Sequence, residues 1–197
     1  MKPLPFPLIL GSASPRRKKI LDTLGFAFSV SAPDTEEIHD AADPVHTVVF
    51  NATAKYRACR ERHPAAAIIA ADTLVWLDGK LIGKPADLGE AARFLRAFSG
   101  RTQIVFTGVA LGLPEQADPD IRVEASSVTF KTLSEQAIQD YLSRTNPLDR
   151  AGAYDIDENG DLLIARYSGS RTNIMGLPEA PVRDWLEALS HASQETP

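Results

Sequence analysis

The chain has 197 residues, a formal net charge of −5 and a pI near 5.4. This length suits one sizeable core, so we expect a single domain over residues 1–197. The excess of acidic over basic residues excludes a large nucleic-acid-binding surface. The one cysteine, Cys59, excludes a disulfide framework and a cysteine-based metal site. No apolar run reaches the roughly 18 residues of a membrane span, and prolines interrupt the apolar stretch before Gly11. A soluble, cytoplasmic protein is therefore predicted.

The first elements are a short strand, a tight turn and a helix. Leu8 to Leu10 is an apolar run, Gly11 to Ala13 is a turn of small residues, and Ser14 and Pro15 are a typical N-cap and first helical residue. Four cations, Arg16 to Lys19, follow at the positive end of this helix, where each forfeits about 0.3–1 kcal/mol. This unfavourable placement of four cations at a positive helix end indicates a bound anion, and phosphate is the best candidate. A solvated basic turn is the alternative.

The next segments predict a strand, an acidic loop and a helix. Phe26 to Ala32 is the expected strand, residues 33–40 form the loop, and Asp43-Pro44 begins the helix. Lys55 falls within the apolar stripe of that helix. Either its ammonium reaches the solvent at the rim, or it enters a cleft above the core.

The strongest strand signal runs from Ala66 to Leu77 and contains one carboxylate, Asp72. An isolated carboxylate in such a strand is costly unless it is paired or hydrogen-bonded. Asp72 therefore either accepts hydrogen bonds from loop N–H groups in a structural role, or it binds a metal or acts as a base.

A hairpin follows this strand, because Asp78-Gly79 is a typical two-residue turn. If Leu77 pairs with Lys80, then Thr73 pairs with Lys84, which brings Lys84 close to Asp72. A bulge would decide which face of the sheet the lysine takes.

The remaining pattern alternates helices and strands up to the C-terminus. We expect helices after Asp87, after Thr132 or Ser134, and around 182–189, and strands at 103–113, 123–131 and 162–167, with loops at 145–160 and 168–177. This order predicts an α/β fold with a twisted, mixed β-sheet and helices on its faces.

The basic and acidic candidates together suit phosphoanhydride chemistry. Cations hold phosphate oxygens, and two carboxylates suit Mg²⁺, so the set predicts metal-assisted attack of water on a phosphoanhydride. The sequence lacks the P-loop, dinucleotide-binding, zinc-protease and nucleophile-elbow motifs. The candidates are Arg16, Arg17, Lys55, Lys84, Asp72 and Glu37.

Several motifs, in order, resemble the Maf family of nucleoside triphosphate pyrophosphatases. The opening signature is Ser12-Ala13-Ser14-Pro15-Arg16-Arg17, and the resemblance runs nearly end to end. The further matching motifs are Asp34-Thr35-Glu36-Glu37, Ala54-Lys55, Ala71-Asp72-Thr73, Gly83-Lys84-Pro85, Ala151-Gly152-Ala153-Tyr154 and Gly176-Leu177-Pro178.

The resemblance implies hydrolysis between the α- and β-phosphates of a nucleotide, giving the monophosphate and pyrophosphate. It implies a deep substrate cleft, a divalent cation (Mg or Mn) and commonly a homodimer. Asp72 would be the proton acceptor and Glu37 would lie beside it at the metal. The implied phosphate-binding residues are Ser12, Arg16, Arg17, Lys55 and Lys84.

The base preference follows from three positions. The branch of the family that acts on dTTP and UTP resembles this chain at Arg16 and Thr73, but its third position, usually glutamine, is Asp157 here. A carboxylate lacks the paired donor and acceptor of an amide. The branch acting on 7-methyl-GTP typically has an acid there and a tryptophan in place of Arg16. We expect dTTP, UTP or modified pyrimidine nucleotides, with 7-methyl-GTP or a broad range as the alternative.

Two other classes of function stay open. One is a phosphatase or nucleotidyl transferase that uses the same cations. The other is a nucleotide-binding cell-division regulator with little turnover, because the family has been linked to septum formation.

Overall fold

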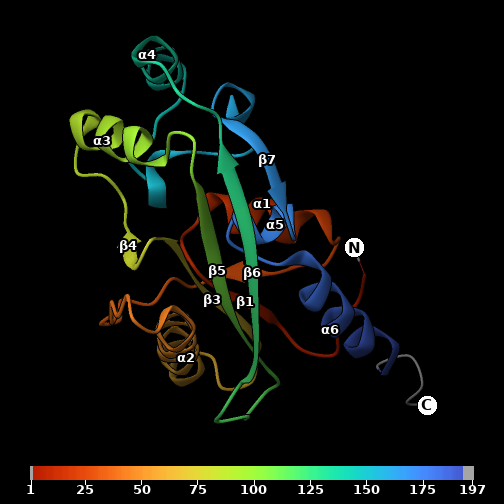
Figure 1. Ribbon diagram of the computed structural model, residues 1–197. Coiled ribbons are helices and arrows are strands. Elements are labelled where there is room, and N and C mark those ends of the chain that lie inside the picture. Colours follow the sequence, from red (N-terminus) through yellow and green to blue (C-terminus); the bar gives the residue numbers. More distant parts are fainter. Residues whose placement is uncertain (1, 193–197) are drawn as a thin grey trace.

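The computed structural model describes residues 2–192 and contains a seven-stranded mixed sheet with helices packed around it (Figure 1). The strand order is β2-β1-β3-β5-β6-β7, and β4 forms a hairpin with β3. β2, β1 and β3 are parallel, whereas the other pairs are antiparallel. The predicted α/β class is confirmed. The strands are β1 (Leu8–Gly11), β2 (Ser29–Val30), β3 (Ala67–Leu77), β4 (Lys80–Ile82), β5 (Thr102–Gly112), β6 (Asp120–Phe130) and β7 (Ile164–Ser168).

Six α-helices and two short 3₁₀ turns accompany the sheet within the described range. The predicted N-caps Ser14, Asp43, Asp87 and Ser134 each accept a hydrogen bond from the backbone N–H three residues later. Within residues 2–192, no helix combines the length and apolarity needed to cross a membrane. The helices are α1 (Pro15–Thr23), α2 (Pro44–Arg62), α3 (Leu88–Phe98), α4 (Glu135–Arg144), α5 (Arg171–Ile174) and α6 (Glu179–Ala192).

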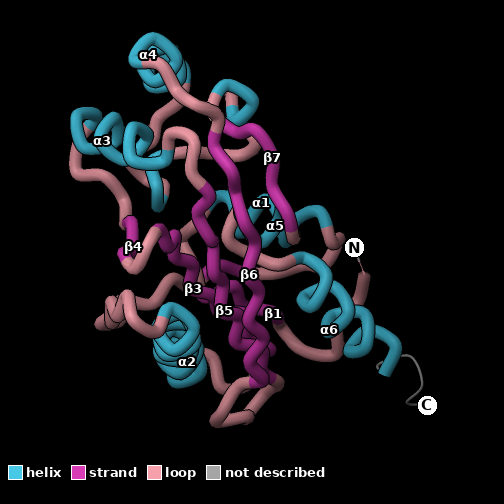
Figure 2. The backbone as a smooth tube through the Cα atoms, viewed as in Figure 1, coloured by secondary structure: helices cyan, strands magenta, loops and turns pink. Residues whose placement is uncertain are grey.

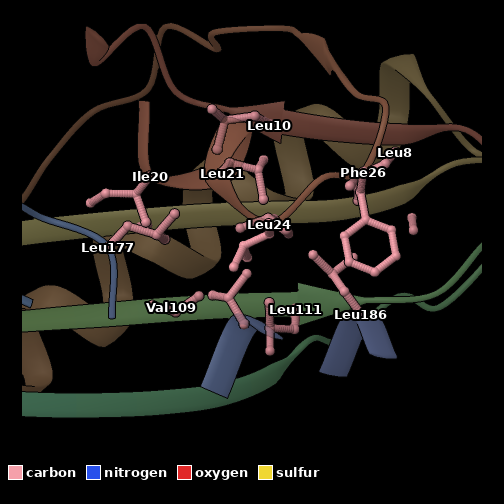
Figure 3. Close-up of a cluster of buried hydrophobic side chains, with 14 residues drawn as sticks. Leu8, Leu10, Ile20, Leu21, Leu24, Phe26, Val109, Leu111, Leu177 and Leu186 are labelled. Carbon is pink, nitrogen blue, oxygen red and sulfur yellow. The ribbon is translucent and has the colours of Figure 1, made fainter. Parts of the chain in front are cut away.

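The alternation of side chains along β1 and β3 builds a separate core on each face of the sheet. Leu8 and Leu10 join a cluster with α1 and α6 residues such as Leu21 and Leu186 (Figure 3). Ile9, between them, packs instead with the α2 side chains. Figure 1 accordingly shows α2 and α6 on opposite sides of the strands. A third cluster lies where α3 and α4 cover the far end of the sheet.

β3 has two different partners along one of its edges. β1 pairs with Ala67 to Ala70, and β4 pairs with Val75 to Leu77. Among the described residues, no strand pairs with this edge between these two segments, where Asp72 and Thr73 lie. Because successive side chains point to opposite faces, Asp72 faces α2 and Thr73 faces the side of α1.

Two predictions about strands are wrong. The strand expected over 26–32 is only Ser29–Val30, because β1 is itself short and pairs with just two of these residues. The hairpin does begin with Leu77 opposite Lys80, but β4 ends at Ile82. Thr73 therefore has no pairing with Lys84, and its partner is Thr107 on the other edge.

Candidate active site

A cleft of about 930 Å³ opens at the gap between β1 and β4. Its walls come from the start of α1, the long loop before α2, α2 itself, the end of the hairpin and residues 149–156. Figure 2 shows that long loop as an extended stretch beside α2 and near β4. The cleft gathers the predicted residues Ser12, Arg16, Arg17, Glu37, Lys55, Asp72, Thr73 and Lys84.

The ammonium of Lys55 lies between two carboxylates. Its Nζ is 2.6 Å from Oδ1 of Asp72 and 2.7 Å from Oε1 of Glu37. The lysine therefore enters the cleft, as one of the two interpretations of the sequence proposed. Asp72 is 7% exposed and is bound by side chains, so the interpretation as a carboxylate that accepts from loop N–H groups is wrong. The arrangement places a buried carboxylate and its paired cation at the cleft wall.

Asn51 is a residue of this cluster that sequence reasoning missed. Its Nδ2 donates to Oδ2 of Asp72 at 3.0 Å, and its side chain also binds the backbone of Ile38 in the acidic loop. The signal in the sequence is a buried-face amide one helical turn before Lys55, four residues away on α2.

Arg17 is fixed at the cleft by three protein acceptors. Its Nε donates to the Gly176 carbonyl at 2.7 Å, and its two terminal nitrogens donate to the Ser12 and Thr73 hydroxyls at 2.9 Å each. Burial lowers the pKa of Arg17, while the negative charges of Asp72 and Glu37 act in the opposite direction. An arginine stays protonated at neutral pH, so a fixed positive charge lines the cleft.

The other three cations of α1 lie differently. Arg16 lines the cleft and contacts the Asp149 carboxylate and carbonyl, each at 3.4 Å. Lys18 pairs with Asp22 at the surface, and Lys19 lies 3.8 Å from Asp157. The basic start of α1 thus divides into two residues in the cleft and two with outer carboxylate partners.

Lys84 is an exposed residue of the cleft wall. It follows the end of β4, where the carbonyl of Gly83 accepts a hydrogen bond from the Gly152 N–H at 3.0 Å. This bond joins the hairpin to the 3₁₀ turn at Ala151–Ala153. Lys84 therefore shares the cleft with Asp72 without the strand pairing that the sequence predicted.

Asp157 lies next to the cleft, with its carboxylate bound by a cation. Nε and a terminal nitrogen of Arg171 are 2.8 and 2.6 Å from its Oδ1. Asp155 and Ile156 are among the described residues that line the cleft, and Asp157 is not. Its role in base selection stays a prediction.

The two carboxylates beside Lys55 fit a divalent cation that phosphate groups also bind. Within residues 2–192, no cluster of three or more histidine, cysteine or acidic side chains is arranged to hold a metal alone. Mg²⁺ commonly binds through one or two carboxylates together with substrate phosphates and water. Glu37 and Asp72, which meet at one ammonium in the cleft, provide such a pair.

Comparison with known proteins decides the family. A family model described as "Maf-like protein" matches residues 7–189. The chain belongs to the Maf family.

Curated Maf relatives cover nearly the whole chain. A dTTP/UTP pyrophosphatase of Akkermansia muciniphila is 40% identical over 185 residues, which are 93% of this chain and 95% of the relative. A dTTP/UTP pyrophosphatase of Deinococcus radiodurans is 42% identical, covering 89% of each chain. A crystal structure of a nucleoside-triphosphatase / dITP/XTP pyrophosphatase from Mycobacterium abscessus is 16% identical, with a TM-score of 0.43, over 96% of this chain and 97% of that one.

Proposed function

We propose that this Maf protein hydrolyses nucleoside triphosphates to the monophosphate and pyrophosphate, with dTTP and UTP as its preferred substrates. The observation that carries the proposal is the Asp72–Lys55–Glu37 cluster in the same cleft as Arg16 and Arg17. Curated relatives about 40% identical over most of their length are named dTTP/UTP pyrophosphatases, which supports the same reaction.

The residues of the cleft divide into a base and a phosphate clamp. Asp72 accepts the proton of the attacking water, and Lys55 and Asn51 hold its two oxygens in place. Glu37 and Asp72 would hold a Mg²⁺ or Mn²⁺ ion, which would stabilise negative charge on the phosphate oxygens. The phosphate clamp would bind the triphosphate and the departing pyrophosphate, and it consists of Ser12, Arg16, Arg17, Lys55 and Lys84.

Base selection is proposed to depend on Arg16, Thr73 and Asp157. Arg16 can donate to the carbonyl oxygens of a uracil or thymine ring. The Thr73 hydroxyl is bonded to Arg17 and Thr107, so it would shape the cleft mainly by its position. Arg171 binds Oδ1 of Asp157, so Oδ2 is the oxygen that would contact the base. We further propose that the enzyme acts in the cytoplasm as a homodimer, which size-exclusion chromatography with light scattering tests for the purified chain.

The decisive experiment is a substrate panel. The purified protein is incubated with Mg²⁺ or Mn²⁺ and natural and modified triphosphates, including 7-methyl-GTP, and pyrophosphate is measured. We expect pyrophosphate release to be fastest with dTTP or UTP and to need the divalent ion. Asp72→Asn should be folded and inactive, and the surface variant Asp118→Asn, whose side chain is 80% exposed, should be active.

Four results would contradict this proposal in different ways. Release of orthophosphate alone would indicate a phosphatase, and transfer of the nucleotide to an acceptor would indicate a nucleotidyl transferase. Tight nucleotide binding without any product under excess metal would indicate a regulator. Full activity of Asp72→Asn would remove the proposed mechanism.

A further inference from the structure

Two buried polar residues of α2, one helical turn apart, bind the acidic loop. The Thr47 hydroxyl accepts from the Asp40 N–H at 3.2 Å, and its one proton faces the carbonyls of Asp40 and Asp43 at 3.1 and 3.0 Å. The Asn51 side chain accepts from the Ile38 N–H at 2.9 Å and donates to the Ile38 carbonyl at 3.1 Å. Both residues are 1% exposed. The loop is therefore fixed to the helix at two neighbouring positions.

Asn51 differs from Thr47 because it also binds the base. Its amide has two N–H donors, of which one is directed at the Ile38 carbonyl and the other at Oδ2 of Asp72. Its oxygen faces the Ile38 N–H. The opposite amide orientation would place an oxygen against a carbonyl and a carboxylate, so these partners permit one orientation.

The bonds of Asn51 determine which way the two carboxylates point. Because Asn51 binds Oδ2 of Asp72, Oδ1 is left to face Lys55. Because it binds both backbone polar groups of Ile38, it fixes the residue next to Glu37. Glu37 and Asp72 come from segments 35 positions apart in the sequence, and the amide of Asn51 joins those segments directly.

We propose that Asn51 is a positioning residue, which sets the rotation of the Asp72 carboxylate and holds the Glu37 loop against it. The proposal rests on the function proposed above. In its absence the Asp72 carboxylate turns about its Cβ–Cγ bond, and the oxygen that accepts the proton is misplaced, although the nucleotide still binds through the cationic groups of the cleft.

Three variants separate this role from simple support of the loop. Asn51→Ala removes all three bonds. Asn51→Asp has the same shape and keeps the acceptor for the Ile38 N–H, but its second oxygen replaces the two donors that bind Asp72 and the Ile38 carbonyl. Thr47→Val removes the second loop anchor and leaves Asp72 untouched. For each folded variant, kcat and KM are measured, and hydrogen exchange of the Ile38 amide is followed without nucleotide or metal.

We expect Asn51→Ala to lower kcat by about 10- to 100-fold, the range for a lost hydrogen bond to a charged group, with KM near the wild-type value. Ile38 should exchange faster in this variant. In Asn51→Asp the Ile38 amide should stay protected while kcat falls at least as far, because the Ile38 N–H keeps its acceptor and the Asp72 contact is lost. Thr47→Val should retain most of the wild-type kcat.

Two results would overturn the inference. One is a folded Asn51→Asp enzyme with wild-type kcat. The other is a Thr47→Val enzyme that loses as much kcat as Asn51→Ala, since order in the loop would then be the whole effect. A wild-type enzyme that releases no pyrophosphate from any triphosphate would instead be a failure of the proposed function.

Discussion

Replacing Lys55 by methionine tests the centre of the site. Methionine keeps an unbranched side chain of similar length along the core but removes the ammonium that lies 2.6 Å from Asp72 and 2.7 Å from Glu37. The side chains of Lys55 and Asp72 are 13% and 11% exposed, so two carboxylates would face each other with little solvent to screen them. The variant should therefore be less stable.

The size of the effect follows from the burial of the partners. Removing one member of a buried ion pair costs about 3–5 kcal/mol. The Glu37 side chain is 37% exposed, so its share of the interaction is screened, and about 3 kcal/mol is expected for the whole site. For a chain of this length, that loss lowers Tm by roughly 6–12 °C.

Divalent ions should reverse part of this loss. In Lys55→Met the pair Glu37 and Asp72 keeps its four carboxylate oxygens and lacks a cation, so Mg²⁺ should raise Tm more in the variant than in the wild type. Pyrophosphate release should stay far below the wild-type rate even with Mg²⁺, because one cation of the clamp is missing.

The assay is thermal unfolding in EDTA and in Mg²⁺, with pyrophosphate release measured in parallel. Lys18→Met is the matched control, because Lys18 pairs with Asp22 at the surface and should contribute about 0.5 kcal/mol or less. Two results would refute the reasoning. One is a Tm of Lys55→Met in EDTA equal to that of the wild type, and the other is an equal rise in Tm of Lys55→Met and the wild type when Mg²⁺ is added.

Three further predictions concern the pH dependence, the packing of α2 and the Arg17 contacts. Burial raises the pKa of Tyr141 to about 12, so the free energy of unfolding should fall by up to about 1.4 kcal/mol per pH unit as pH rises from 10 towards 12, where the unfolded tyrosine ionises and the folded one does not. In Tyr141→Phe, the free energy of unfolding measured with urea should fall less steeply with pH between 10 and 12. An equal fall with pH in the variant and the wild type would contradict the assignment of this pH dependence to Tyr141. Gly108→Ala would place a Cβ 2.6 Å from the Val48 carbonyl oxygen of α2, and the shift of that helix should cost about 1–3 kcal/mol in urea unfolding. Gly83→Ala, whose methyl meets open space, is the control. Equal urea midpoints for Gly108→Ala and Gly83→Ala would exclude this steric effect. Arg17→Lys should lose most activity despite its charge, because one ammonium cannot replace the guanidinium contacts with Ser12, Thr73 and the Gly176 carbonyl. Wild-type kcat and KM in that variant would show that charge alone suffices.

Local sequence patterns determined the elements and most of the candidate residues. The turn after β1 and the N-cap Ser14 depend on neighbouring residues, and so does the hairpin at Asp78-Gly79, where both residues have positive φ. An isolated carboxylate in an apolar strand identified Asp72, and a lysine in an apolar helical stripe identified Lys55. Periodicities of 2 and 3.6 residues assign a side chain to a face, which is enough to nominate these groups.

Only the tertiary structure decided which of these groups meet. Arg17 binds the carbonyl of Gly176, 159 residues away, and Asn51 binds Asp72, 21 residues away. The same holds for Asp157, whose partner Arg171 follows a strand and a loop. Periodicity shows that a face is buried but not which element covers it, nor where a neighbouring strand ends. The end of β1 at Gly11 and of β4 at Ile82 leaves one edge of β3 unpaired at Asp72, and that feature of strand pairing places the cleft.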